Sequence, residues 1–225
     1  MTEASAVVGP PLPVVVLISG SGSNLQALID AQGAWPYRIC AVISNERTAF
    51  GLERARRAGI PTAVVSHRAY ADRAAFDQAL TAAIDRRTPG LVALAGFMRI
   101  LTPAFVAHYA GRILNIHPSL LPKFRGLHTH HRALEAGEHE HGASVHFVTA
   151  ELDGGPVILQ GRVPILPTDD LEQLGARVLA AEHRLYPQVV GWFAQRRLRL
   201  REDGRALFDG AVLDVPLRLD DRTPG

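Results

Sequence analysis

Residues 113–122, Ile-Leu-Asn-Ile-His-Pro-Ser-Leu-Leu-Pro, constrain the fold of this chain more than any other stretch. They begin as an apolar run typical of a buried strand. Residues two apart in a strand project from the same face, so Asn115 and His117 would lie side by side. Pro118 has no N–H to donate to a sheet and ends the strand at once. The pair would therefore stand at the carboxyl end of a strand, where open α/β sheets bind their ligands.

Asn115 and His117 suggest a specific chemistry at that strand end. An amide N–H and a protonated imidazole aimed at one point can stabilise an oxygen that becomes negatively charged during a reaction. The alternative is an ordinary strand end with a hydrogen-bonded histidine, and this short motif alone does not decide between the two.

Composition limits the architecture and the partners. The 225 residues, 47% of them hydrophobic, suffice for one α/β domain with a full core or at most two small ones. A net charge of +2 gives no strong field for binding nucleic acid. Cys40, the only cysteine, is expected to pack as a small buried hydrophobe in a reducing compartment. We find neither a signal peptide nor a membrane-spanning run, which predicts a cytoplasmic protein.

Buried strands and amphipathic helices alternate along most of the chain. Strands are expected at 14–19, 38–44, 61–66, 91–95 and 113–117, with helices at 25–30, 50–58, 69–87 and 103–109. This alternation predicts an α/β fold with a doubly wound, mostly parallel, Rossmann-like sheet. After residue 140, strands at 143–148 and 157–164 predict an antiparallel addition to the sheet. A long helix is expected at 171–193. We expect a disordered leader over residues 1–13, one domain over 14–198 and a short C-terminal extension over 199–225.

The turn Gly20-Ser21-Gly22-Ser23-Asn24 connects the first strand to a helix. Glycines let the backbone approach an anion closely, and the helix N-terminus offers unpaired N–H groups. The turn is not a dinucleotide fingerprint, because Leu25 stands where the third glycine belongs, and it lacks the lysine of a P-loop. It predicts either a phosphate cradle or only a tight turn.

Two further sets of polar residues invite a functional interpretation. Asp153 precedes two glycines and is either a turn aspartate or, if it approaches His117, a carboxylate that favours the imidazolium. The histidines at 128, 130, 131, 139 and 141 lack the spacing of a zinc site, and no cysteine joins them. We expect solvated or hydrogen-bonded loop histidines there, and no metal.

Four segments together resemble a known family. Residues 17–26, 94–101, 115–119 and 152–156 are similar, in this order, to the phosphoribosylglycinamide formyltransferases, folate-dependent enzymes of purine biosynthesis. The resemblance covers about residues 14–198. Residues 31–37 are shorter than expected from the family, and Phe124-Arg125-Gly126 replaces Tyr-Pro-Gly. The resemblance also implies a cis bond between Leu121 and Pro122.

The resemblance implies a reaction and a set of residues for it. A formyl group would pass from 10-formyltetrahydrofolate to the glycinamide amine of 5-phosphoribosylglycinamide through a tetrahedral intermediate. Asn115 and His117 would hold the oxyanion, His117 would act as general acid, and Asp153 would keep His117 protonated. The substrate phosphate would bind Gly22, Ser23 and Asn24, and the ribose would bind Glu182. The folate contacts would be Arg73, Met98, Arg99, Ile100, Leu101, Asn115 and the backbone of Thr149, Ala150, Glu151, Leu152 and Asp153.

The same resemblance implies small-molecule substrates only, with no metal, nucleic acid or membrane partner, and a monomer or homodimer. Three alternatives remain open. A formyltetrahydrofolate hydrolase uses the same three residues with water but carries an N-terminal regulatory domain. A methionyl-tRNA formyltransferase needs a C-terminal RNA-binding domain, for which the sequence offers no residues. A non-catalytic nucleotide-binding module would explain the glycine turn but not the three catalytic candidates.

Overall fold

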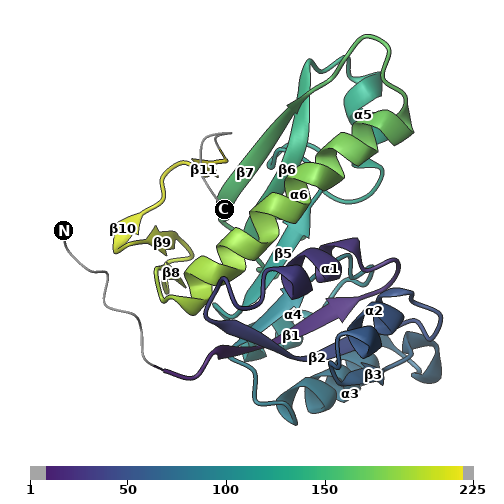
Figure 1. Cartoon of the computed structure of the whole chain (residues 1–225), viewed down its shortest axis with the longest axis vertical. Helices are drawn as coiled ribbons and strands as arrows, with labels where there is room; N and C mark the ends of the chain where they lie inside the picture. The colour runs from purple at the N-terminus through teal and green to yellow at the C-terminus, as the bar shows by residue number, and fades with distance from the viewer. Residues whose placement is uncertain (1–8, 220–225) are drawn as a thin grey trace.

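A central twisted sheet organises residues 9–219, which the computed structural model describes (Figure 1). The strand order is β11-β7-β6-β5-β4-β1-β2-β3. These strands are β1 (Leu12–Ile18), β2 (Tyr37–Ser44), β3 (Thr62–Val64), β4 (Leu91–Leu94), β5 (Ile113–His117), β6 (Glu140–Phe147), β7 (Val157–Pro164) and β11 (Leu217–Arg218). Strands β1 to β5 pair in parallel, whereas β6 is antiparallel to both β5 and β7. The predicted fold class, with its antiparallel addition, is confirmed.

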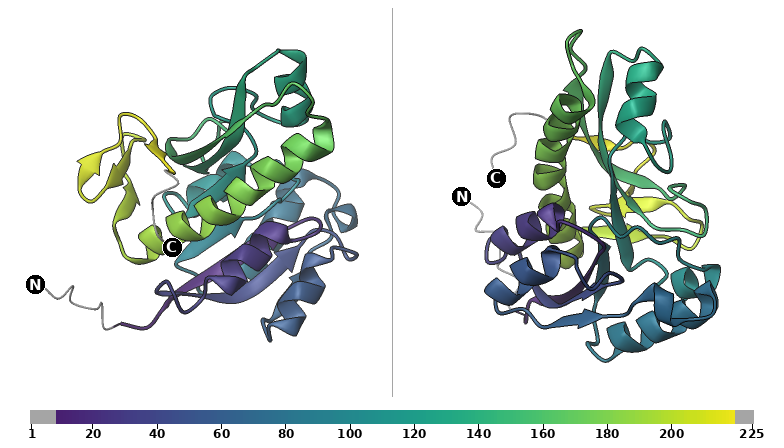
Figure 2. Two further views of the ribbon diagram at one scale, coloured as in Figure 1. Left: turned by 45° about the horizontal axis from the view of Figure 1, so that its top comes forward. Right: turned by 90° about the vertical axis from the view of Figure 1, so that its right-hand side faces the viewer.

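Helices cover both faces of the sheet, as Figure 2 shows from two directions. Helices α1 (Ser23–Asp30), α2 (Gly51–Arg57) and α6 (Leu171–Ala194) pack on one face, and α3 (Arg73–Asp85) and α4 (Pro103–His108) pack on the other. The central strand β1 shows why both faces need a cover. Val14, Val16 and Ile18 enter the core beneath α1 and α6, while Val15 and Leu17 enter the core beneath α3. Alternating side chains of one apolar strand therefore supply two cores.

Element ends differ from the sequence-based expectation where a polar group fixes them. The helix expected at 69–87 is split into a short 3-10 helix, η1 (His67–Ala69), and α3, because the Asp72 carboxylate accepts the Ala75 N–H at 2.8 Å and caps α3. Strand β1 includes Leu12 and Pro13, which the sequence assigned to the leader, because Leu12 N–H donates to Pro36 O. Residues 1–8 of that predicted leader lie outside the described residues.

The segment after residue 197 folds against the main body. Strands β8 (Leu198–Leu200), β9 (Ala206–Phe208) and β10 (Ala211–Val212) form a small antiparallel sheet. The chain then returns, and β11 pairs in parallel with β7. Leu217 and Leu219 pack against the core beneath α6, so the region expected to be a plain extension closes one edge of the main sheet.

The loop after β5 is tied to β6 and β7 by buried hydrogen bonds. The Leu121–Pro122 bond is cis, which confirms the prediction. Leu121 N–H donates to Ser144 Oγ at 3.0 Å, and the Ser144 hydroxyl donates to Ser119 O at 2.6 Å. Gln160 on β7 donates to Leu121 O at 2.9 Å. These bonds fix the path of the chain as it leaves the end of β5 and runs toward helix α5 (Thr129–Glu135).

Candidate active site

Asn115, His117 and Asp153 meet at the carboxyl end of β5. Asn115 and His117 project from β5, and Asp153 comes from the loop between β6 and β7. His117 Nδ1 lies 3.5 Å from Asp153 Oδ2, and the two side chains are only 7% and 9% exposed. Gly155 lets this loop fold back on β6, because a Cβ at that position would lie 1.9 Å from Phe147 O. The approach of Asp153 to His117 that the functional interpretation required is therefore present.

Both ring nitrogens of His117 face hydrogen-bond acceptors. Nε2 lies 3.0 Å from Phe124 O, and Nδ1 faces the Asp153 carboxylate. The same carboxylate oxygen accepts the N–H of Gly126 at 2.9 Å, which holds Asp153 in place. An imidazolium donates from both nitrogens, whereas a neutral ring donates from only one. His117 is therefore held between two acceptors, one at each ring nitrogen.

His146, which the sequence analysis did not single out, orients Asn115. It lies opposite Asn115 in the β5–β6 pairing, and its Nε2 is 3.2 Å from Asn115 Nδ2. Its Nδ1 faces Phe147 O at 2.8 Å and must carry a proton, so Nε2 is the acceptor. Burial lowers the pKa of His146 to about 4, which keeps the ring neutral. The position of His146 opposite Asn115 follows from the register of β5 against β6, and no sequence motif in β6 indicates it.

Two adjoining cavities open beside the three catalytic candidates. The larger, of about 690 Å³, is lined by Asn115, His117 and Asp153 and by an apolar rim that includes Met98 and Ile100. The smaller, of about 130 Å³, shares Asn115 and Asp153. Every residue predicted to contact folate lines one cavity or both: Arg73, Met98, Arg99, Ile100, Leu101, Asn115, Thr149, Ala150, Glu151, Leu152 and Asp153. The side chain of Met98 is 64% exposed at the rim, an apolar surface for a planar ring.

The glycine turn has the geometry of an anion cradle. Gly22 adopts φ +70°, and a Cβ there would lie 2.5 Å from Gly51 Cα, so the turn needs glycine at that point. Among the described residues, the backbone N–H groups of residues 22–24 have no acceptor. Asn24 Nδ2 donates to Glu182 Oε2 at 2.6 Å, while Asn24 Oδ1 is buried without a partner. Burial raises the pKa of the Glu182 carboxyl, and its bond from Asn24 partly opposes this. The turn, Asn24 and Glu182 thus form one polar site with donors left over.

Two of the five histidines singled out in the sequence, His130 and His141, pair with each other. His130 Nδ1 lies 3.1 Å from His141 Nε2, and burial lowers the pKa of both rings, that of His141 to about 4. His141 is 1% exposed within β6, so the expectation that it is a loop histidine is wrong. Across residues 9–219, the structure groups no three His, Cys, Asp or Glu side chains that could hold a metal ion.

Comparison with known proteins identifies the family. The model of the formyl transferase family matches residues 12–190, most of the chain. The chain belongs to the formyl transferase family. The phosphoribosylglycinamide formyltransferase of Escherichia coli K12 is 58% identical over 202 residues, which cover 89% of this chain and 95% of that protein. The trifunctional purine biosynthetic protein adenosine-3 of Homo sapiens is 45% identical over 194 residues, which cover 85% of this chain and 19% of that protein.

Solved structures agree with this assignment to the formyl transferases. The phosphoribosylglycinamide formyltransferase of Coxiella burnetii superposes with a TM-score of 0.88 at 52% identity, over 92% of this chain and 99% of that one.

Within residues 9–219, every helix is too short or too polar to cross a membrane.

Proposed function

We propose that this formyl transferase moves the formyl group of 10-formyltetrahydrofolate to the amine of 5-phosphoribosylglycinamide, a step of purine biosynthesis. The observation that carries the proposal is the meeting of Asn115, His117 and Asp153 in the wall of the 690 Å³ cavity. The likeness to phosphoribosylglycinamide formyltransferases over nearly their whole length supports the same substrates.

The three residues have separate tasks in the proposed reaction. Attack of the amine on the formyl carbon gives a tetrahedral intermediate with negative charge on the formyl oxygen. Asn115 donates a neutral hydrogen bond to this oxygen, and His117 donates a charged, stronger one. His117 exchanges its internal acceptor, Phe124 O, for that oxygen and then gives a proton to the departing folate nitrogen. Asp153 keeps His117 protonated until that step and relays to it the proton that the attacking amine loses, so the ring is protonated again at the end of the reaction.

The substrates bind on either side of this centre. The free N–H groups of Gly22, Ser23 and Asn24 hold the phosphate, and Glu182 accepts a ribose hydroxyl hydrogen. A ribose hydroxyl would also satisfy the unpartnered Asn24 Oδ1. The folate ring lies against the apolar rim around Met98, and Arg73, an exposed residue at the start of α3, meets its acidic tail.

Transfer kinetics with both substrates test the proposal directly. Purified protein should convert glycinamide ribonucleotide only when 10-formyltetrahydrofolate is supplied, and isothermal titration should detect each ligand separately. Formate release from the folate alone, at the same rate with and without the ribonucleotide, would instead identify a hydrolase. Binding of nucleotide with no turnover of either ligand would identify a non-catalytic module.

We also propose, as the sequence analysis predicts, that the protein works in the cytoplasm as a monomer or homodimer. Light scattering of the purified protein and fractionation of cells that contain it test these two points.

A further inference from the structure

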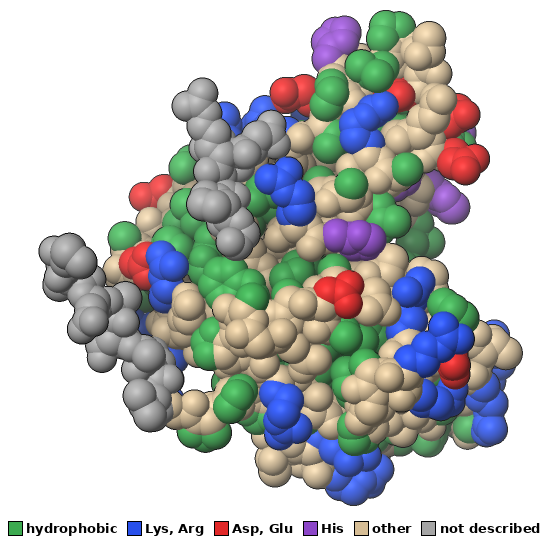
Figure 3. Space-filling view, in the orientation of Figure 1, with side chains coloured by type: hydrophobic (Ala, Val, Ile, Leu, Met, Phe, Trp, Pro, Cys, Tyr) green, Lys and Arg blue, Asp and Glu red, His purple; other side chains and the backbone are tan. Residues whose placement is uncertain are grey.

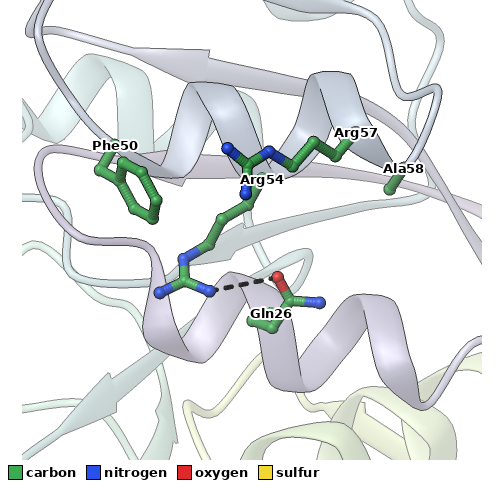
Figure 4. A pocket seen from close by; sticks show the side chains of 5 residues that line it. All are labelled: Gln26, Phe50, Arg54, Arg57 and Ala58. Atoms are coloured by element: carbon green, nitrogen blue, oxygen red, sulfur yellow. Dashed lines mark hydrogen bonds between the residues drawn. The ribbon is translucent and has the colours of Figure 1, made fainter.

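Arg54 reaches from α2 to the start of α1, beside the glycine turn. Its Nε–H donates to Ser21 O at 2.9 Å, and one Nη–H donates to Gln26 Oε1 at 3.3 Å, as Figure 4 shows for Gln26. The guanidinium carbon also lies 5.0 Å from the centre of the Phe50 ring. These three contacts hold the side chain at one edge of a cavity of about 360 Å³.

The bond to Ser21 O determines where the next N–H points. The Ser21–Gly22 peptide is trans, so its C=O and N–H point in opposite directions. Arg54 therefore fixes the direction of the Gly22 N–H by holding the carbonyl oxygen on the side of α2. This N–H is one of the three amide donors that have no acceptor among the described residues.

Arg54 also brings a positive charge that no carboxylate cancels within residues 9–219. Basic side chains gather over α2 on the face shown in Figure 3, and α2 carries Arg54, Arg56 and Arg57. Glu53 lies 3.7 Å from Arg56 and 2.9 Å from Arg57, so those two are paired. Arg54 meets only neutral partners in Ser21 and Gln26. Its field also reaches α6, because it adds to burial in lowering the pKa of His183.

We propose that Arg54 is a positioning residue for the phosphate of the substrate. It sets the Ser21–Gly22 peptide so that the Gly22 N–H faces the phosphate, and it adds positive charge beside the neutral amide donors. This inference rests on the proposed function. It adds Arg54, which lies outside the motif Gly22-Ser23-Asn24, to the residues on which phosphate binding depends.

Removal of the phosphate from the substrate isolates the effect of Arg54. The values of kcat/KM are measured with glycinamide ribonucleotide and with its dephosphorylated nucleoside, for the wild type and for Arg54→Met. The ratio of the two values should fall about tenfold in Arg54→Met, the effect of one charge-assisted hydrogen bond, while KM for the folate stays near normal. Arg57→Met is the matched control, because Arg57 lines the same cavity but is paired with Glu53. Arg54→Gln supplies a second variant should Arg54→Met fold poorly.

A merely structural role would lower kcat/KM equally for the nucleotide and the nucleoside, and that result overturns the inference. Protection by inorganic phosphate against thermal unfolding gives a second readout that needs no turnover. Phosphate should raise the unfolding temperature less in Arg54→Met than in the wild type, and equal shifts in both proteins count against Arg54. If phosphate protects the wild type more than Arg54→Met but the protein transfers no formyl group, the proposed function is refuted and the inference about Arg54 is not. Formyl transfer with an unchanged ratio in Arg54→Met would refute the inference alone.

Discussion

Asp153→Asn removes the charge beside His117 with little change of shape. In the wild type the Gly126 N–H donates to the Asp153 carboxylate at 2.9 Å. The amide oxygen of asparagine can still accept this N–H, so the loop should keep its position. Opposite unit charges at the observed 3.5 Å attract by roughly 5 kcal/mol at an effective dielectric constant of about 20. Burial of both groups offsets part of this attraction. We assign about 3–4 kcal/mol to catalysis, which corresponds to a loss of about 10²–10³ in kcat.

Steady-state kinetics with both substrates saturating measure this loss, and circular dichroism checks that the variant folds. KM for each substrate should change little, because Asp153 acts through His117. The double variant with His117→Ala should be little slower than either single variant, since the two residues act as a unit. Glu138→Gln is the control, because Glu138 pairs with Lys123 in an exposed contact at 2.7 Å. A kcat of Asp153→Asn within tenfold of the wild type would refute the proposed role of the carboxylate.

Three further predictions follow from the geometry. Gly22→Ala should raise KM for the ribonucleotide at least tenfold because its Cβ would lie 2.5 Å from Gly51 Cα, whereas Gly20→Ala, with open space around it, should not; equal KM values in the two variants would contradict the cradle. Arg73→Ala should raise KM for the folate more at low salt than at high salt, because exposed charges are screened; a salt-independent effect would exclude an ionic contact. His141, with its pKa lowered to about 4 in the fold, contributes stability that is present above pH 6.5 and is lost as the pH falls from 6.5 to about 4, by about 1.4 kcal/mol per pH unit. Denaturant titrations at several pH values should show a shallower fall for His141→Phe than for the wild type, and identical slopes would refute this assignment.

The sequence predicts those parts of the site that depend on local rules. The period of two in a strand and the stop at Pro118 place Asn115 and His117 together at a strand end, as the structure has them. Contacts between segments that are far apart in the sequence could not be predicted in this way. The bond from Asn24 to Glu182 joins residues 158 positions apart, and the register of β5 against β6 sets His146 opposite Asn115. Neither follows from spacing along the chain, because each depends on how the sheet is assembled.

The Phe124-Arg125-Gly126 segment shows why a departure from the family pattern can leave the chemistry intact. Its two contacts with the catalytic candidates are made by the backbone: Phe124 O faces His117, and Gly126 N–H donates to Asp153. Replacing the tyrosine and proline expected from the family therefore changes neither contact. Arg125, in place of that proline, instead pairs with Glu151 in the loop that carries Asp153. The Arg125–Glu151 pair, together with the Gly126–Asp153 bond, joins the two loops that contact His117, so the position of Phe124 O, which His117 leaves in the proposed reaction, depends on both loops.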